Sequence, residues 1–170
     1  AFGTVIRLLY AYHYPGFEWD IVCFANWADA LLRDGAGNFY ISDMYTDYPP
    51  GYLYVLGILS AIKHFFGLTS YTKMHIMVLK LPAIICDILT CGLIYKEAKE
   101  QLKDEEKALL AMSVYLFNPA VILNSSIWGQ VDSVYTLCVL LMCIFLTKKK
   151  MFFAYAVYGI GLLIKPQMMI

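Results

Sequence analysis

The sequence has little charge of either sign and no dense cluster of basic residues. Of its 170 residues 15% are charged, and the formal net charge is +0. Nucleic-acid-binding domains carry a basic patch or stripe, so we expect no nucleic-acid partner. Soluble domains are about 25% charged and about 45–50% apolar, whereas 61% of this chain is hydrophobic. The composition therefore predicts an integral membrane protein.

Motifs for metal, disulfide and nucleotide chemistry are also missing. The five cysteines have no metal-ligand spacing, and four of them lie in apolar runs, where thiols behave as small hydrophobic groups. The sequence has no metal-binding pattern of histidine, cysteine and glutamate, no glycine-rich phosphate loop and no serine–histidine–aspartate arrangement. We therefore expect no disulfide framework, no metal ion and no cofactor.

Long apolar runs predict an all-α membrane fold. A spanning helix needs roughly 20 mostly apolar residues, and we predict spans over residues 75–95, 108–131, 133–147 and 151–167. Residues 1–12 are apolar but too short to span, so we interpret them as the outer part of a first span. The chain begins without Met and ends in an apolar run. We expect residues 1–170 to be the N-terminal part of one longer transmembrane domain.

Between the first two predicted spans lies a long acidic loop, residues 13–74. It carries Glu18, Asp20, Asp29, Asp34, Asp43 and Asp47. Residues 20–33 have apolar side chains at helical spacing. Residues 52–66 are apolar almost throughout, but as a helix they would be about 22 Å long, which is short for a span. We predict that both segments are helices lying on the membrane.

The placement of lysines predicts the orientation. We predict that the charged residues 96–107 form a soluble loop. This loop and residues 148–150 are lysine-rich and separated by two predicted spans, so they share a side, which the positive-inside rule makes cytoplasmic. If residues 52–66 do not span, the acidic loop lies on the external face with residues 124–132 and 165–167. If residues 52–66 did span, the loop would be cytoplasmic and these polar segments would not meet.

Asp20 stands where the acidic loop leaves the first predicted span. One interpretation is a helix cap or a solvated acid. The other is a general base, because a carboxylate beside aromatic residues at a membrane surface is partly desolvated and accepts a proton more readily.

Two further segments carry side chains that suit a binding site. One predicted span closes with Trp128, Gln130 and Asp132. Lipid contact would be costly for Gln130 and Asp132, so we expect both side chains to face protein or a water-filled cavity. The plain alternative is an interfacial helix end anchored by Trp128. Lys165 and Gln167 follow an uncharged run on the predicted external face. An anionic ligand such as a phosphate would explain Lys165, although a lysine at the end of a span can also snorkel.

Other polar residues leave alternatives open. Asp47 is predicted either to cap the following helix or to line the site, and Tyr48 begins a Tyr-Pro-Pro turn that fixes the start of that helix. Lys80 and Asp87 share a helix face but are too far apart to pair directly, so their role stays open. Arg7 must snorkel or face protein.

A succession of short motifs covers nearly the whole chain. In order, it consists of Asp20, Trp27-Ala28, Leu31, Gly35, Phe39-Tyr40, Asp47-Tyr48-Pro49-Pro50-Gly51, Leu79-Lys80-Leu81-Pro82, Asp87, Asn118-Pro119, Trp128-Gly129-Gln130-Val131-Asp132-Ser133 and Lys165-Pro166-Gln167. In their order and spacing, these motifs resemble the bacterial multi-span glycosyltransferases of the GT-C superfamily. They are also similar, more distantly, to the endoplasmic-reticulum glucosyltransferases that extend the dolichol-linked oligosaccharide.

The resemblance implies a GT-C-like helix bundle whose large first external loop holds two membrane-lying helices. It implies inverting transfer of a hexose from a polyprenyl-phosphate donor, usually without an essential metal. Asp20 would be the general base, Lys165 would contact the lipid phosphate, and the site would be lined by Asp47, Tyr48, Trp128, Gln130, Asp132 and Gln167. The family's donor site is usually completed by helices beyond those present here, so this segment can be inactive alone.

The same resemblance implies the surroundings of the enzyme. It would be a multi-pass protein of the bacterial plasma membrane, in contact with membrane lipids, with its active site on the external face. The acceptor would be a lipid-linked glycan, a glycan or a protein.

Two other functions are compatible with the residues. A transporter or flippase for a lipid-linked or polar solute would use Asp87, Gln130 and Asp132 as a polar pathway reaching both faces. Residues 133–147 and 151–164 offer almost no polar path, which favours the enzyme. In a membrane scaffold the external carboxylates would simply be solvated.

Overall fold

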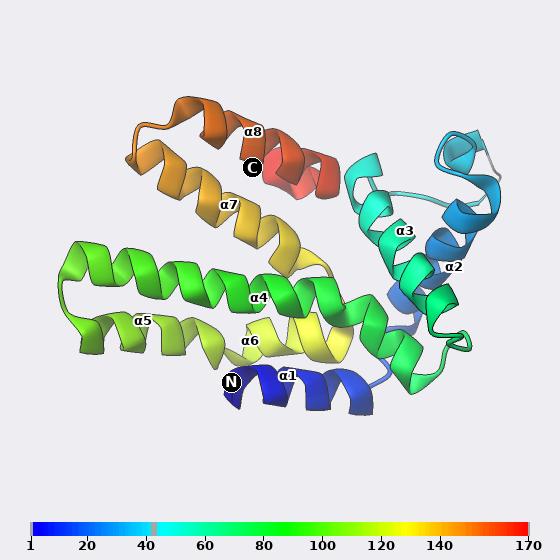
Figure 1. Ribbon diagram of the computed structural model, residues 1–170, viewed down its shortest axis with the longest axis horizontal. Coiled ribbons are helices and arrows are strands. Elements are labelled where there is room, and N and C mark those ends of the chain that lie inside the picture. The colour runs from blue at the N-terminus through cyan, green and yellow to red at the C-terminus, as the bar shows by residue number, and fades with distance from the viewer. Residues whose placement is uncertain (1, 42–43, 170) are drawn as a thin grey trace.

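The regular secondary structure is helical throughout the residues that the computed structural model describes, 2–41 and 44–169 (Figure 1). This confirms the predicted all-α class. Asp43, which we expected in the acidic loop, lies outside the described residues. The helices in chain order are α1 (Phe2–His13), α2 (Glu18–Asp34), η1 (Phe39–Ile41), α3 (Pro50–Phe65), α4 (Lys73–Leu102), α5 (Glu105–Leu116), α6 (Pro119–Ile122), η2 (Leu123–Trp128), α7 (Asp132–Thr147), α8 (Met151–Ile164) and η3 (Pro166–Met169).

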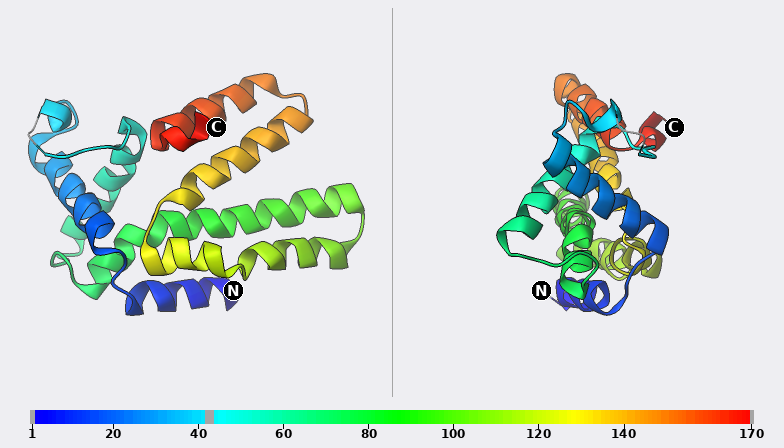
Figure 2. Two further views of the ribbon diagram at one scale, coloured as in Figure 1. Left: turned by 180° about the vertical axis from the view of Figure 1, so that it is seen from behind. Right: turned by 90° about the vertical axis from the view of Figure 1, so that its right-hand side faces the viewer.

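The long helix α4 is the centre of the arrangement. It packs against α1, α5 and α7, and α7 forms a hairpin with α8. Helices α2 and α3 pack on each other and stand across one end of this bundle (Figures 1 and 2). The chain therefore places the acidic loop over the end of the bundle where α1, η2 and α8 also terminate.

The predicted helices of the loop are present. We expected helices over residues 20–33 and 52–66, and the structure has α2 over Glu18–Asp34 and α3 over Pro50–Phe65. Acidic residues in the first turn suit the positive end of α2, and Gly35, with φ 78°, ends it. Pro50 opens α3, where its missing N–H costs nothing.

Residues 96–107 are not the loop that we expected. Helix α4 continues to Leu102, and Lys103 and Asp104 alone connect it to α5. Lys103 ends α4 in the left-handed conformation, and the Asp104 side chain accepts a hydrogen bond from the Lys107 N–H to begin α5. A high density of charge made this segment look like a loop, but charged residues of this kind are good helix formers.

Residues 108–131 do not form the single helix that we expected. Helix α5 ends at Leu116, and the chain bends by 44° before it continues through α6 and η2. Pro119 has no N–H and disfavours a helical conformation at Asn118. The Asn118 side chain instead accepts a hydrogen bond from the Ala120 N–H and begins α6. The last turns, Leu123–Trp128, are π-helical and end at Gly129, with φ 92°.

Among the described residues, α4 is long and apolar enough to cross a membrane. The bent segment formed by α5, α6 and η2 is a second candidate, and α7 and α8 are apolar but shorter. The remaining predicted spans stay predictions.

The two lysine-rich segments, residues 96–107 and 148–150, lie at the same end of the bundle, as predicted. Lys148 Nζ lies 2.7 Å from a Glu97 carboxylate oxygen and 3.3 Å from one of Glu100. The connections from α1 to α2, from α3 to α4 and from η2 to α7 gather at the opposite end (Figure 1). Which side of a membrane each end faces stays a prediction.

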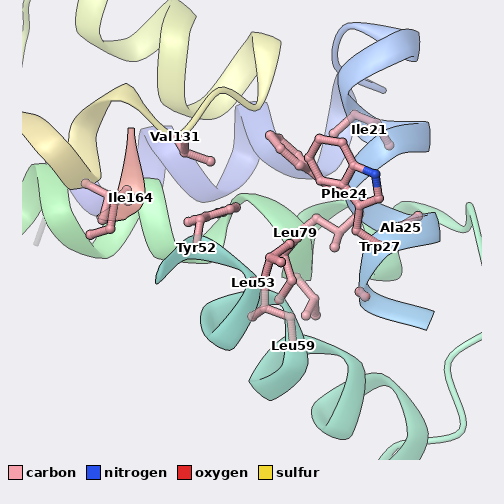
Figure 3. Close-up of a cluster of buried hydrophobic side chains, with 14 of the residues drawn as sticks. Ile21, Phe24, Ala25, Trp27, Tyr52, Leu53, Leu59, Leu79, Val131 and Ile164 are labelled. Atoms are coloured by element: carbon pink, nitrogen blue, oxygen red, sulfur yellow. The ribbon is translucent and has the colours of Figure 1, made fainter. Parts of the chain in front are cut away.

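A buried apolar core joins the loop helices to the bundle. Phe24 and Trp27 of α2, Tyr52 and Leu53 of α3, and Leu79 of α4 pack in one cluster (Figure 3). Burying a large apolar side chain contributes about 1.5–3 kcal/mol. This packing fixes α2, and with it Asp20, relative to α4.

Arg7 and Asp87, whose roles the sequence left open, form a buried ion pair between α1 and α4. Arg7 Nε lies 3.0 Å from Asp87 Oδ2, and neither side chain is exposed to solvent. The Ser125 hydroxyl of η2 donates to the same carboxylate at 2.7 Å. The pair thus joins three segments, and Arg7 faces protein rather than lipid.

Candidate functional site

Asp20 lies in the first turn of α2 and meets two residues at the end of the π-helical turn. The indole N–H of Trp128 donates to Asp20 Oδ2 at 2.8 Å, and Gln130 Nε2 donates to the same oxygen at 2.6 Å. Asp20 does not cap α2, because the N-cap is Phe17 and no side chain caps that end. Asp20 Oδ1 has no hydrogen-bond partner within the described residues. One carboxylate oxygen is therefore held and the other is available.

Gln130 connects Asp20 to two further predicted residues. Its side-chain oxygen accepts from the Tyr48 hydroxyl at 3.3 Å and lies 3.4 Å from Lys165 Nζ. Lys165 also forms an ion pair with Asp132. One amide side chain thus bridges the carboxylate of Asp20 and the ammonium of Lys165.

These side chains surround a cavity of about 310 Å³ at the end of the bundle. A volume of this size is at the lower end of the range for small-molecule sites. The cavity is lined by Trp19, Asp20, Cys23, Phe24, Trp27, Tyr45, Asp47, Tyr48, Gln130, Lys165, Pro166 and Gln167.

Two predicted lining residues stand behind the cavity instead. Trp128 holds Asp20 through its N–H, while its ring packs on Phe17, with the ring centres 5.1 Å apart, and lines a separate apolar cavity. Asp132 contacts Lys165 on one side and accepts from Asn124 Nδ2 at 2.9 Å on the other. Both residues position groups that line the cavity.

Asp47 lines the cavity and does not cap α3. That helix begins after Pro49 without a side-chain cap. Asp47 is exposed and accepts a hydrogen bond from the Tyr45 hydroxyl at 3.1 Å. The sequence left two roles open for Asp47, capping α3 or lining the site. The geometry matches the second role.

Burial and negative charge raise the pKa of two groups on the cavity wall. Burial, followed by the carboxylates of Asp132, Asp20 and Asp47, raises the pKa of the Tyr48 phenol well above its ordinary value. Burial, Asp47 and Asp20 likewise raise the pKa of the Cys23 thiol. Tyr48 therefore stays a neutral hydrogen-bond donor at alkaline pH as well as at physiological pH.

Several residues of the cavity were not predicted from the sequence. Cys23 and Trp27 follow Asp20 at intervals of three and seven residues, so all three share one face of α2. Trp27 also donates to the Tyr45 carbonyl at 2.8 Å, which holds the loop before α3 against α2. The helical spacing alone was enough to find these two residues.

The fold and the site together define a class of protein. The described residues form a helical fold that sets a carboxylate, an amide and a lysine around one end cavity, which agrees with the GT-C-like glycosyltransferases that the motifs resemble. A family model described as dolichyl-phosphate-mannose-protein mannosyltransferase matches residues 47–170, and the chain belongs to this family. No curated protein and no solved structure matches the chain.

Membership of this family establishes the coarse function. Its members are membrane-integral glycosyltransferases, mannosyltransferase-like, that take the sugar from a polyprenyl-phosphate donor and pass it to a glycan or protein acceptor. The matched range contains Tyr48, Gln130 and Lys165 and leaves out Asp20. The place of Asp20 in the site therefore rests on its contacts.

Proposed function

We propose that this chain forms part of an inverting hexosyltransferase site in which Asp20 is the general base. The observation that carries the proposal is the convergence of Asp20, Gln130 and Lys165 on one cavity, from three segments that are far apart in the sequence. Two N–H donors hold one oxygen of Asp20 in place, so the second oxygen is oriented to accept a proton.

The reaction is a single displacement. The acceptor hydroxyl gives its proton to Asp20 and its oxygen attacks the anomeric carbon of the hexose. The bond from that carbon to the phosphate oxygen breaks, and its electron pair leaves with the polyprenyl phosphate. One displacement inverts the configuration at the anomeric carbon. A second displacement, which would restore it, needs a separate carboxylate nucleophile.

Lys165 is proposed to bind the phosphate of the lipid carrier. An ammonium has three N–H donors, and Gln130 and Asp132 accept two of them. The third is available to an anionic ligand in the cavity. Positive charge at this position also stabilises the negative charge that develops on the leaving phosphate.

The same proposal places the active site on the external face of a bacterial plasma membrane. Supporting this, the acidic loop lies at the end of the bundle opposite the lysine-rich segments, and Lys165 contacts Gln130 at the same end as the loop. The acceptor is a lipid-linked glycan, a glycan or a protein. The transporter alternative gains no support, because Asp87 pairs with Arg7 and lies apart from the cavity that Gln130 lines.

The test is Asp20→Asn in the full-length enzyme, assayed with polyprenyl-phosphate mannose and polyprenyl-phosphate glucose as donors and host membranes as the source of acceptor. We expect turnover to fall by about 10²–10⁴-fold, the usual contribution of a general base, while donor binding is kept. Asp34→Asn, at the other end of the same helix, is the matched control and should transfer normally. Near-normal turnover of Asp20→Asn would remove it from the role of base.

A further inference from the structure

We propose that Lys80 is a positioning residue of the transfer reaction. It holds the ends of α1 and η2 together and thereby sets the distance between Asp20 and its hydrogen-bond donors. This inference rests on the proposed function, since it takes Asp20 as the reacting base. It concerns a residue that does not line the cavity and so does not touch the substrate.

The ammonium group of Lys80 is buried and bonded to three backbone carbonyls. Its Nζ donates to the carbonyl oxygens of Tyr14 at 2.7 Å, Ser126 at 3.0 Å and Ile127 at 3.1 Å. The side chain is fully buried. An ammonium has three N–H donors, so each one has its own acceptor.

All three carbonyls belong to helix ends. Tyr14 follows α1, which ends at His13, while Ser126 and Ile127 lie in the last turn of η2, which ends at Trp128. The last carbonyls of a helix have no partner within it, and the C-terminal end carries partial negative charge. A lysine ammonium donates hydrogen bonds to the unpaired carbonyls and also carries the positive charge that this end of a helix favours. Lys80 does this for the ends of two helices.

The chain runs directly from this contact to the site. From Tyr14 it passes through Pro15 and Gly16 to α2 and Asp20, and from Ile127 it passes to Trp128 and Gln130. A displacement of one helix end relative to the other would therefore be transmitted to the 2.6 Å bond between Asp20 and Gln130.

The two segments also touch each other beyond Lys80. The Phe17 N–H donates to the Trp128 carbonyl at 2.9 Å. Gly16 has φ 87°, and a Cβ at that position would lie 2.7 Å from the same carbonyl oxygen. A Cβ on Gly129 would lie 3.2 Å from Lys80 Cε. This close contact leaves little room for the segments to shift while Lys80 is in place.

The experiment compares Lys80→Met with the full-length wild-type enzyme. Methionine keeps an unbranched apolar stem like that of lysine and removes the terminal ammonium with its three donors. We expect a properly folded variant whose kcat is reduced by about tenfold or more, since small misplacements of reacting groups cost up to about 100-fold. The KM for polyprenyl-phosphate mannose should stay within about twofold of wild type. Lys63→Met, which removes a lysine paired with Asp29 away from the cavity, is the control and should keep wild-type kcat.

A double-mutant cycle with Gln130→Leu separates positioning from a general effect on the fold. If Lys80 acts through the contact of Gln130 with Asp20, Lys80→Met should cost much less in the Gln130→Leu background than in wild type. Equal costs in the two backgrounds, or wild-type kcat in Lys80→Met, would overturn the proposal.

The remaining outcomes are also decisive. If Lys80→Met does not fold, Lys80→Gln takes its place in the cycle, because glutamine keeps two N–H donors. If neither variant folds, Lys80 has a general folding role and the proposal is overturned. If Asp20→Asn is inactive while Lys80→Met is normal, this inference alone fails. If Asp20→Asn is active, Asp20 is not the general base, and the inference about Lys80, which rests on that role, fails with it.

Discussion

Gln130 Nε2 lies 2.6 Å from Asp20 Oδ2, although 110 positions separate the two residues in the chain. Gln130 stands between a carboxylate that can accept a proton and an ammonium that can bind a phosphate. An amide is suited to this place, because its N–H₂ donates to the carboxylate while its oxygen accepts from Lys165 and Tyr48. The orientation of one side chain therefore couples the proposed base to the proposed donor site.

Replacement of Lys165 by Met should weaken binding of the lipid-phosphate donor more than binding of the acceptor. A hydrogen bond to a charged group contributes about 1.5–3 kcal/mol, so we expect the donor affinity to fall by about tenfold or more. Equilibrium binding of polyprenyl phosphate measures this directly. Lys148→Met, at the opposite end of the bundle, is the matched control, and unchanged donor affinity in Lys165→Met would contradict a phosphate role.

The raised pKa of Tyr48 predicts how stability depends on alkaline pH. An unfolded tyrosine ionises near its ordinary pKa of about 10, whereas Tyr48 in the folded protein stays protonated beyond that value. The folded state then binds more protons than the unfolded state, so the free energy of unfolding falls as pH rises above about 10. Above this pH, the midpoint temperature of thermal unfolding should fall more steeply with pH in wild type than in Tyr48→Phe. If the midpoint temperatures of the two proteins fell in parallel with pH, the pKa of Tyr48 would not be raised by folding.

The Cys23 thiol should react slowly with iodoacetamide. The thiolate is the reactive form, and burial together with Asp47 and Asp20 raises the pKa of this thiol. At about pH 8, close to the ordinary cysteine pKa, alkylation followed by mass spectrometry of the Cys23 peptide should be slower than alkylation of a free thiol. Asp47→Asn removes one negative charge and should increase the rate, whereas Asp34→Asn should not. An unchanged rate in Asp47→Asn would show that Asp47 does not act on the cavity wall.

The Arg7–Asp87 pair should be far less tolerant of single than of double replacement. Asp87→Leu leaves a buried, unpaired guanidinium and should destabilise the fold by about 3–5 kcal/mol. Arg7→Met combined with Asp87→Leu should recover most of that loss. The midpoint of thermal unfolding in detergent measures both.

The more exposed pair of Lys63 and Asp29 provides the comparison for this experiment. Exposed ion pairs contribute about 0–1 kcal/mol. The Asp29 side chain is 43% exposed, so Asp29→Leu should cost less than Asp87→Leu. If Asp87→Leu were as stable as the double variant, an unpaired Arg7 guanidinium would carry no cost in this fold and the prediction would be wrong.

The elements of the loop could be predicted because their signals are local. The apolar spacing that predicted a helix over residues 20–33 describes the buried face of α2, and Pro50 marks the start of α3. The break at Asn118-Pro119 was equally visible in the sequence. The prediction of one span over residues 108–131 passed over it, because apolar residues continue on both sides of the proline.

The roles of Lys80 and Asp87 could not be predicted. Their partners are backbone carbonyls and side chains 28 to 80 positions away. A buried charge must be paired wherever it lies, but the sequence does not say which helix brings the partner.

The sequence by itself determined the helical class, the acidic loop and the side chains able to carry the chemistry, because composition and helical period are properties of neighbouring residues. The tertiary structure decided which of these side chains meet. It placed Asp20 against Gln130, moved Trp128 and Asp132 behind the cavity, and gave Lys80 two helix ends to hold. Those outcomes depend on how α2 packs across the end of the bundle, and packing between distant segments is set by the whole core rather than by any one stretch of the chain.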